Sequence, residues 1–210
     1  MSVRAESDFL FRSLFAVVLI AVCAGLCGCT SSAKPDNDPS PHLSRAAQRT
    51  QALRYVDQAQ TAAKKGKNDE AIGFYQQALR LSTSLDGAWN NLGVLLLDRK
   101  SYQDAIFAFG RAADLNPGDP RPMTNIGIAY SRAGHAEKAL RAFEDALVRD
   151  PNWIDALRGA AKSAKLLRIA DEKSLDRIMH ALLIEPDDEW RMFFERERFR
   201  IQGMIEARNP

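Results

Sequence analysis

The stretch DGAWNNLGVLLLDRKSYQDAIFAFGRAADLNPGD, Asp86–Asp119, decides the fold of this 210-residue chain. Its large apolar residues recur at the spacing of helix turns, which predicts two amphipathic helices. The small residues Gly93 and Ala105 lie where two such helices could approach each other closely. Pro117 follows the second helix and turns the chain, because proline has no N–H to continue a helix. The stretch therefore predicts one antiparallel helix pair.

The same pattern returns on both sides of this stretch with a period of 34 residues and no gaps. Residues Ala52–Leu85 form the preceding block and Pro120–Trp153 the following block. A degenerate fourth block starts at Ile154 and needs one inserted residue to align. Such a period is typical of arrays in which each helix pair packs against its neighbours. The sequence thus predicts an all-α solenoid with three clear repeats and a degenerate fourth.

This pattern resembles the tetratricopeptide repeat (TPR), and the resemblance implies a helical-hairpin solenoid over residues 44–186. Gly66 and Gly134 fall at the turn inside a pair, where we expect positive φ, while the second block has Lys100 there. The resemblance is carried in the second block by Trp89, Leu92, Gly93, Tyr102, Ala105, Phe109, Ala112 and Pro117.

In TPR proteins the first helix of each pair lines a concave groove that binds protein or peptide segments. The resemblance implies a groove that is apolar to mixed on its first helices and basic towards its C-terminal end. A basic end would suit an acidic partner. The alternative is a basic face that is only solvated. Chaperone-binding TPRs clamp a terminal carboxylate, but Val56 and Gln60 replace the Lys and Asn needed, so that function is not carried over. The expected groove residues are Asn90, Asn91, Val94, Leu97, Arg121, Thr124, Asn125, Ile128, Arg132, Arg158, Lys162 and Lys165.

The C-terminal segment, residues 187–210, reads as one more amphipathic helix. Trp190, Phe194 and Ile201 follow helical spacing, and Asp187 or Asp188 can cap the N-terminus. We expect this helix to cap the open end of the solenoid. Its density of aromatic residues and arginine also fits a helix that binds a partner or a membrane surface.

The N-terminal residues 1–28 carry a basic flank, a short apolar run and small residues, which is the pattern of an export signal. The run is shorter than a membrane-spanning helix requires, although a retained anchor is the alternative. Its end, LCGC, resembles a bacterial lipobox, which implies lipidation of Cys29. Residues 29–43, rich in Ser, Pro and Asp, read as a flexible linker. Because Thr30 follows the cysteine, the resemblance favours the outer membrane.

Composition gives little indication of chemistry. The formal net charge of +2 argues against a nucleic-acid partner, and the histidines are scattered. No phosphate-binding loop, nucleophile elbow or zinc-protease motif occurs, and no cysteine follows Cys29. We therefore expect no enzyme, cofactor, metal site or small-molecule substrate. The expected function is a lipid-anchored TPR scaffold that binds proteins at the bacterial cell envelope. The resemblance to TPR lipoproteins implies a role in assembling a pilus, a secretion complex or an outer-membrane complex. The alternatives are a docking subunit of an envelope enzyme complex and an exported TPR protein without lipid.

Overall fold

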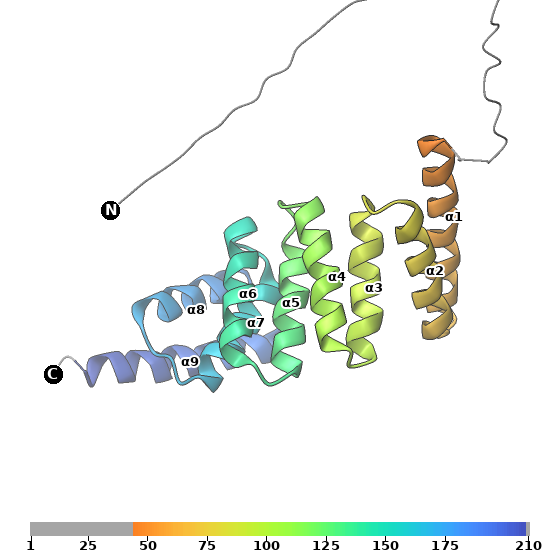
Figure 1. The fold of residues 1–210 in the computed structure, drawn as a ribbon. Coiled ribbons are helices and arrows are strands. Elements are labelled where there is room, and N and C mark those ends of the chain that lie inside the picture. The colour runs from red at the N-terminus through yellow and green to blue at the C-terminus, as the bar shows by residue number, and fades with distance from the viewer. Residues whose placement is uncertain (1–43, 209–210) are drawn as a thin grey trace, which may run out of the picture. The chain divides into compact units, whose positions relative to one another are not determined.

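A computed structural model describes residues 44–208, and the regular secondary structure in this part of the chain is helical (Figure 1). The predicted signal segment 1–28 and linker 29–43 lie outside the described residues. The helices are α1 (Arg45–Lys64), α2 (Asn68–Leu81), α3 (Asp86–Asp98), α4 (Tyr102–Leu115), α5 (Pro120–Arg132), α6 (Ala136–Arg149), α7 (Ile154–Leu166), α8 (Glu172–Ile184) and α9 (Asp188–Glu206).

The helices pack as consecutive pairs, α1 with α2, α3 with α4, α5 with α6 and α7 with α8, and each pair packs onto the next (Figure 1). The first helices of the later pairs start at Asp86, Pro120 and Ile154, which are 34 residues apart. This arrangement confirms the predicted all-α helical-hairpin solenoid. In the part of the chain that the structure describes, no helix is both long and apolar enough to cross a bilayer.

The turn inside each pair uses a left-handed residue. Gly66 has φ of 73° and Gly134 has φ of 83°, as the repeat pattern predicted. In the second and fourth pairs the same conformation falls on Lys100 and Arg168, with φ of 64° and 58°. A side chain with a Cβ is strained there, because the left-handed region places Cβ close to the backbone oxygen.

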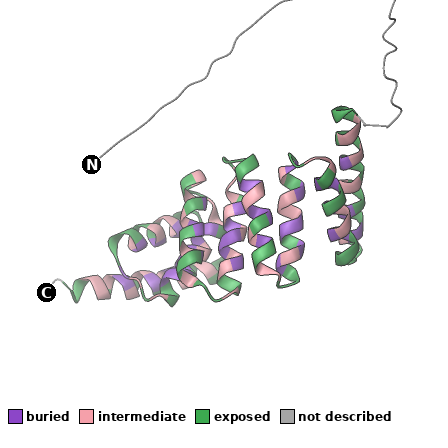
Figure 2. Ribbon diagram, viewed as in Figure 1, coloured by how far each residue is buried: buried purple, intermediate pink, exposed green. Residues whose placement is uncertain are grey.

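The core is built from small residues of one helix facing a phenylalanine of the next. Phe109 is fully buried against Gly93, and Phe143 packs against Gly127 and Gly159. A Cβ on Gly127 would lie 2.7 Å from the Phe143 ring. Figure 2 shows the buried residues along the faces where helices meet. The glycines therefore set how closely the helices approach.

The fourth pair accommodates its inserted residue in the turn between α7 and α8. Asp171 caps α8 by accepting a hydrogen bond from the Ser174 N–H at 2.8 Å. Ile178 and Ala181 are buried beyond the insertion, as their predicted alignment requires. The degenerate block thus keeps the architecture of the others.

Helix α9 packs against α8 and α7 and covers the end of the fourth pair. Asp187 is its N-cap and accepts from the Trp190 N–H at 3.0 Å, as predicted for one of the two aspartates. Phe194 and Ile201 are buried in a cluster with Leu157 and Ile178. The apolar side of α9 is therefore satisfied within the chain, as a capping helix requires.

Candidate partner-binding face

The predicted groove residues lie on α3, α5 and α7, the first helices of successive pairs. We call the open surface of these helices the groove face. It consists of Asn90, Asn91, Val94 and the neighbouring Asp98 on α3, Arg121, Asn125, Ile128 and Arg132 on α5, and Arg158, Lys162 and Lys165 on α7. Every one of these side chains is exposed or half-buried.

Two predicted groove residues do not belong to this surface. Leu97 is only 5% exposed and packs with Phe109 and Ile126, because an apolar side chain gains more from this core contact than from water. Thr124 is 3% exposed, and its hydroxyl donates to the Pro120 carbonyl at 2.9 Å. Neither side chain offers a surface to a partner, so both predictions are corrected.

The asparagines of the groove face link neighbouring helices. The Asn125 side-chain amide donates to the Asn90 side-chain oxygen at 3.0 Å, which ties α5 to α3. Burial raises the pKa of Tyr75, and a hydrogen bond with Asn91 partly offsets that rise. Asn90 and Asn125 are therefore engaged with each other within the array.

Apolar side chains occupy the middle of the groove face. Val94 on α3 is 38% exposed, although valine is usually buried. Ile128 on α5 occupies the same position in the next repeat and is half-buried. This part of the face has the apolar to mixed character that the sequence predicted.

Arg121 and Arg132 on α5 both have carboxylate partners. Arg121 donates to Asp119 from Nε at 3.0 Å and from Nη2 at 2.8 Å. Burial opposes ionisation of Asp119, but the hydrogen bonds and charge of Arg121 outweigh it and lower the pKa of that carboxyl. Arg132 lies 3.5 Å from Asp98 of α3. Part of the basic charge on this helix is thus balanced inside the chain.

Arg158 on α7 is held by the C-terminal region. Its Nε donates to Glu185 at 2.9 Å, and its guanidinium lies 5.0 Å from the centre of the Trp190 ring. The Glu185 side chain is fully buried, and the hydrogen bond from Arg158 lowers the pKa of the Glu185 carboxyl. A buried carboxylate of this kind needs its cation, so Arg158 has a structural role.

Lys165 and Lys162 differ in their environments. Lys165 lies 2.9 Å from the buried Glu197 of α9, which Arg200 also contacts at 2.8 Å. Burial opposes ionisation of Glu197, but the hydrogen bonds from Lys165 and Arg200 outweigh it and lower its pKa. Lys162 is exposed, lies 4.3 Å from the centre of the Trp190 ring, and has no ion pair with another described residue. The basic end of the face is therefore largely neutralised by Glu197 of α9 and by Glu185 in the connection before α9.

Sequence reasoning missed the two acids that neutralise α7. Glu197 stands between Phe194 and Ile201 on the apolar side of α9, where an uncompensated charge would be costly. A carboxylate among the buried apolar residues of a helix indicates that a lysine or arginine of the same chain pairs with it. Glu185 carried no comparable signal, because it lies in the short connection before α9.

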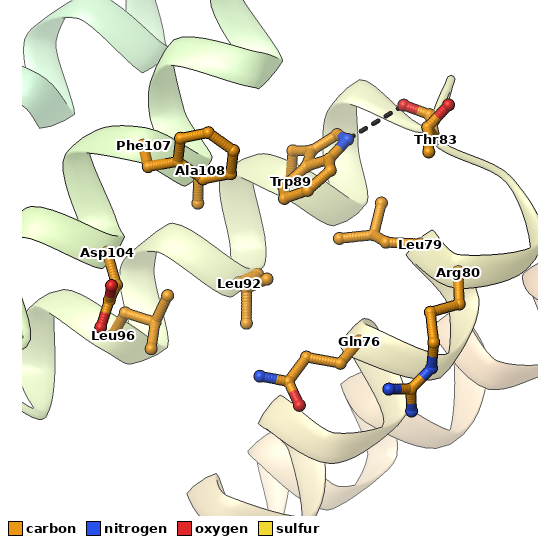
Figure 3. A pocket seen from close by; sticks show the side chains of 10 residues that line it. All are labelled: Gln76, Leu79, Arg80, Thr83, Trp89, Leu92, Leu96, Asp104, Phe107 and Ala108. Atoms are coloured by element: carbon orange, nitrogen blue, oxygen red, sulfur yellow. Dashed lines mark hydrogen bonds between the residues drawn. The ribbon is translucent and has the colours of Figure 1, made fainter.

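A separate pocket of about 600 Å³ lies between α2, α3 and α4 (Figure 3). Leu79 and Arg80 of α2 line one side, and Trp89 and Phe107 line the other. The two rings meet edge to face at 6.0 Å, and the Trp89 indole N–H donates to the Thr83 carbonyl at 2.9 Å. The pocket marks an open contact between the first and second pairs. Among residues 44–208 there is no cluster of three His, Cys, Asp or Glu side chains that could hold a metal ion.

Comparison with known proteins agrees with this architecture. The tetratricopeptide repeat family matches residues 56–120 and again residues 96–164. The chain therefore contains tetratricopeptide repeats, and neither match indicates a catalytic family.

One relative is Superkiller complex protein 3 of Homo sapiens, which is 26% identical over 125 residues, or 57% of this chain and 8% of that protein. The chain spans less than a tenth of the length of this relative. A crystal structure of MamA aligns with a TM-score of 0.60 at 21% identity, over 67% of this chain and 86% of that one. The first TPR domain of Spaghetti (RPAP3), bound to the HSP90 peptide SRMEEVD, aligns with a TM-score of 0.55 at 22% identity, over 58% and 96% of the two chains. These structural similarities establish the fold.

Proposed function

We propose that this chain is a membrane-anchored TPR scaffold that binds a segment of a partner protein at the bacterial cell envelope. The observation that carries the proposal is the groove face. Val94, Ile128 and Lys162 lie at the same register position on successive first helices and leave surface open to solvent. The TPR domain of Spaghetti binds an HSP90 peptide, so this fold is able to present a peptide-binding surface.

The character of the groove face defines the kind of partner. Val94 and Ile128 offer apolar contacts, while Lys162 offers an unpaired ammonium. A protein segment with apolar and acidic side chains would match this order, because apolar burial supplies affinity and charge supplies orientation. An interaction of this kind needs no catalytic group.

The anchoring part of the proposal rests on the lipobox-like residues Leu26-Cys27-Gly28-Cys29. Attachment of two or more acyl chains at Cys29 would hold the protein stably at a bilayer. The segment 29–43, if extended, would give the repeat domain reach from that bilayer. The outer membrane, facing the periplasm, remains the favoured site.

The anchor is tested by labelling the full chain with palmitate in its bacterial host. We expect label and membrane association in the wild type, globomycin-sensitive processing, and loss of all three in Cys29→Ser. If Cys29→Ser keeps both the label and its membrane association, Cys29 is not the anchor.

The binding face is tested by quantitative affinity capture from envelope extracts with the full chain. Val94→Glu places a charge among the apolar contacts and should strongly deplete the proteins that wild type captures. Val148→Glu is the matched control, because Val148 is 83% exposed on α6, a second helix. Equal capture by Val94→Glu and wild type would contradict the proposed face.

A further inference from the structure

Helix α9 continues the array of first helices. It begins at Asp188, which is 34 residues after α7 begins at Ile154, and α7 follows α5 at the same interval. The inserted residue between α7 and α8 is compensated by a shorter connection before α9. In addition, α9 packs against α7, as α7 packs against α5 and α5 against α3. The helix therefore occupies the place of the first helix in a fifth repeat.

The fifth repeat lacks its second helix, and the sequence of α9 shows why the array ends there. Glu195 stands at the register position of Gly93 and Gly127, the glycines against which a second helix packs. Arg191 stands at the position of Trp89. A long charged side chain at either place would keep another helix from packing, so this side of α9 is left to solvent.

Next to Arg191 and Glu195, the exposed surface of α9 carries apolar side chains that capping does not explain. Met192 is 55% exposed and Phe199 is 65% exposed, and Arg196 lies between them in the sequence and is also exposed. By the 34-residue register, Arg196 corresponds to Lys162 on α7. These three residues therefore continue the groove face by one helix. Large exposed apolar side chains gathered on one face commonly mark a contact site.

A shallow depression lies between Lys162 of α7 and the first two turns of α9. It has a volume of about 200 Å³ and is lined by Lys162, Glu189, Trp190 and Phe193. The aromatic rings supply an apolar floor, and Glu189 is the one carboxylate in the lining. Neither Lys162 nor Arg196 forms an ion pair with another described residue. Lys162 and Arg196 therefore present two cations without ion pairs beside apolar groups, and Asp188 and Glu195 line the same hollow as Arg196.

We infer that α9 lengthens the binding face, and that the partner segment bound across α7 and α9 is acidic, with carboxylates interspersed among apolar side chains. The inference rests on the proposed function and narrows its partner class. Packed helix axes lie about 8–10 Å apart, so Lys162 and Arg196 should be separated by roughly that distance. A segment in the polyproline II conformation has three residues per turn and advances about 3.1 Å per residue, so two carboxylates three residues apart lie on one face at a matching separation.

The test uses fluorescence anisotropy with the full chain purified in mild detergent. The probe is a fluorescein-labelled peptide with two glutamates three residues apart and leucines around them, and a second probe has lysines in place of the glutamates. We expect the glutamate probe to bind at least tenfold more tightly. Combining Lys162→Glu with Arg196→Glu should weaken its binding about tenfold or more, and Phe199→Ala should weaken it several-fold.

Arg141→Glu is the matched control, because Arg141 is an exposed arginine on α6, a second helix, away from the groove face. It should bind the glutamate probe as wild type does, with unchanged helical circular dichroism. The inference is overturned if Arg141→Glu weakens binding as much as the double variant, if the double variant binds normally, or if wild type does not prefer the glutamate probe. Partner capture that is lost in Val94→Glu but retained in the α9 variants would remove the inference and leave the proposed function standing.

Discussion

At the scale of single residues, the contact between glycine and phenylalanine limits how closely the helices pack. Phe143 is 2% exposed and lies between Gly127 and Gly159, so its ring has little freedom to move. Interiors of this density respond to the addition of even one methyl group. The identity of these glycines therefore matters through packing rather than through backbone conformation.

We predict that Gly127→Ala lowers the free energy of unfolding by about 1–3 kcal/mol, because the new methyl group collides with a buried ring. Gly110→Ala is the control, since a Cβ at Gly110 in α4 would meet nothing within 4 Å. That substitution should be neutral or stabilise by up to about 1 kcal/mol through helix propensity. Urea denaturation measures both. A Gly127→Ala variant as stable as the control variant would show that the ring yields easily.

At the scale of elements, α9 is held by two buried carboxylates as well as by its apolar side. Glu185 bonds to Arg158 and Glu197 bonds to Lys165, and both cations belong to α7. Removing one partner of such a pair leaves a buried group unsatisfied. The same ion pairs lower the positive charge available to a partner on α7.

The docking of α9 should weaken in acid. The pKa of Glu185 is lowered in the folded chain, chiefly by the hydrogen bond from Arg158. The ionised carboxylate therefore contributes stability above the unfolded pKa of about 4.3, and this contribution is lost as the pH falls through the folded value. We expect Trp190 fluorescence and hydrogen exchange of α9 to report this loosening as the pH falls below about 4.3.

Glu185→Gln provides the comparison, because its amide does not titrate in this range. It should lower the free energy of unfolding at neutral pH by about 1.5–3 kcal/mol, since a charged hydrogen bond is lost. It should also show a smaller acid effect on α9 than wild type, with Glu197 still contributing. The same acid sensitivity in both proteins would mean that Glu185 does not hold the helix.

The sequence predicted the helices better than the surface. The spacing of Gly93, Ala105 and Phe109 is local, and it repeats, so the helix pairs and their stacking follow from the pattern alone. The ion pair between Arg158 and Glu185 joins residues 27 apart across two helices, which no local pattern reveals. Family positions also placed Leu97 in the groove, whereas its core contacts bury it.

At the scale of the whole molecule, the contact between the first and second pairs is the most open. Helix α5 packs against α3 and α7 against α5, whereas α1 has no comparable contact with α3 among the described helices. The 600 Å³ pocket at Trp89 and Phe107 lies at this junction. In a linear array, stability depends on the interfaces between neighbours, so the first pair should open more readily than the middle ones.

We predict from this that native-state hydrogen exchange will give different opening free energies for the first and the third helix pair. Amides of α1 and α2 should report an opening free energy at least about 1.4 kcal/mol below that of α5 and α6, which is a tenfold larger opening constant. One common opening free energy for all four helices would instead show a single cooperative unit.

The central claim is that partners bind to the face formed by α3, α5, α7 and α9. Methyl NMR of the full chain with the glutamate probe tests it most directly, because exposed methyl groups report on both sets of helices. We predict shifts at the exposed methyl groups of Leu166 on α7 and Met192 on α9, while Val148 on α6 and Leu183 on α8 stay unchanged. Shifts at Val148 and Leu183 without shifts at Leu166 and Met192 would contradict the account.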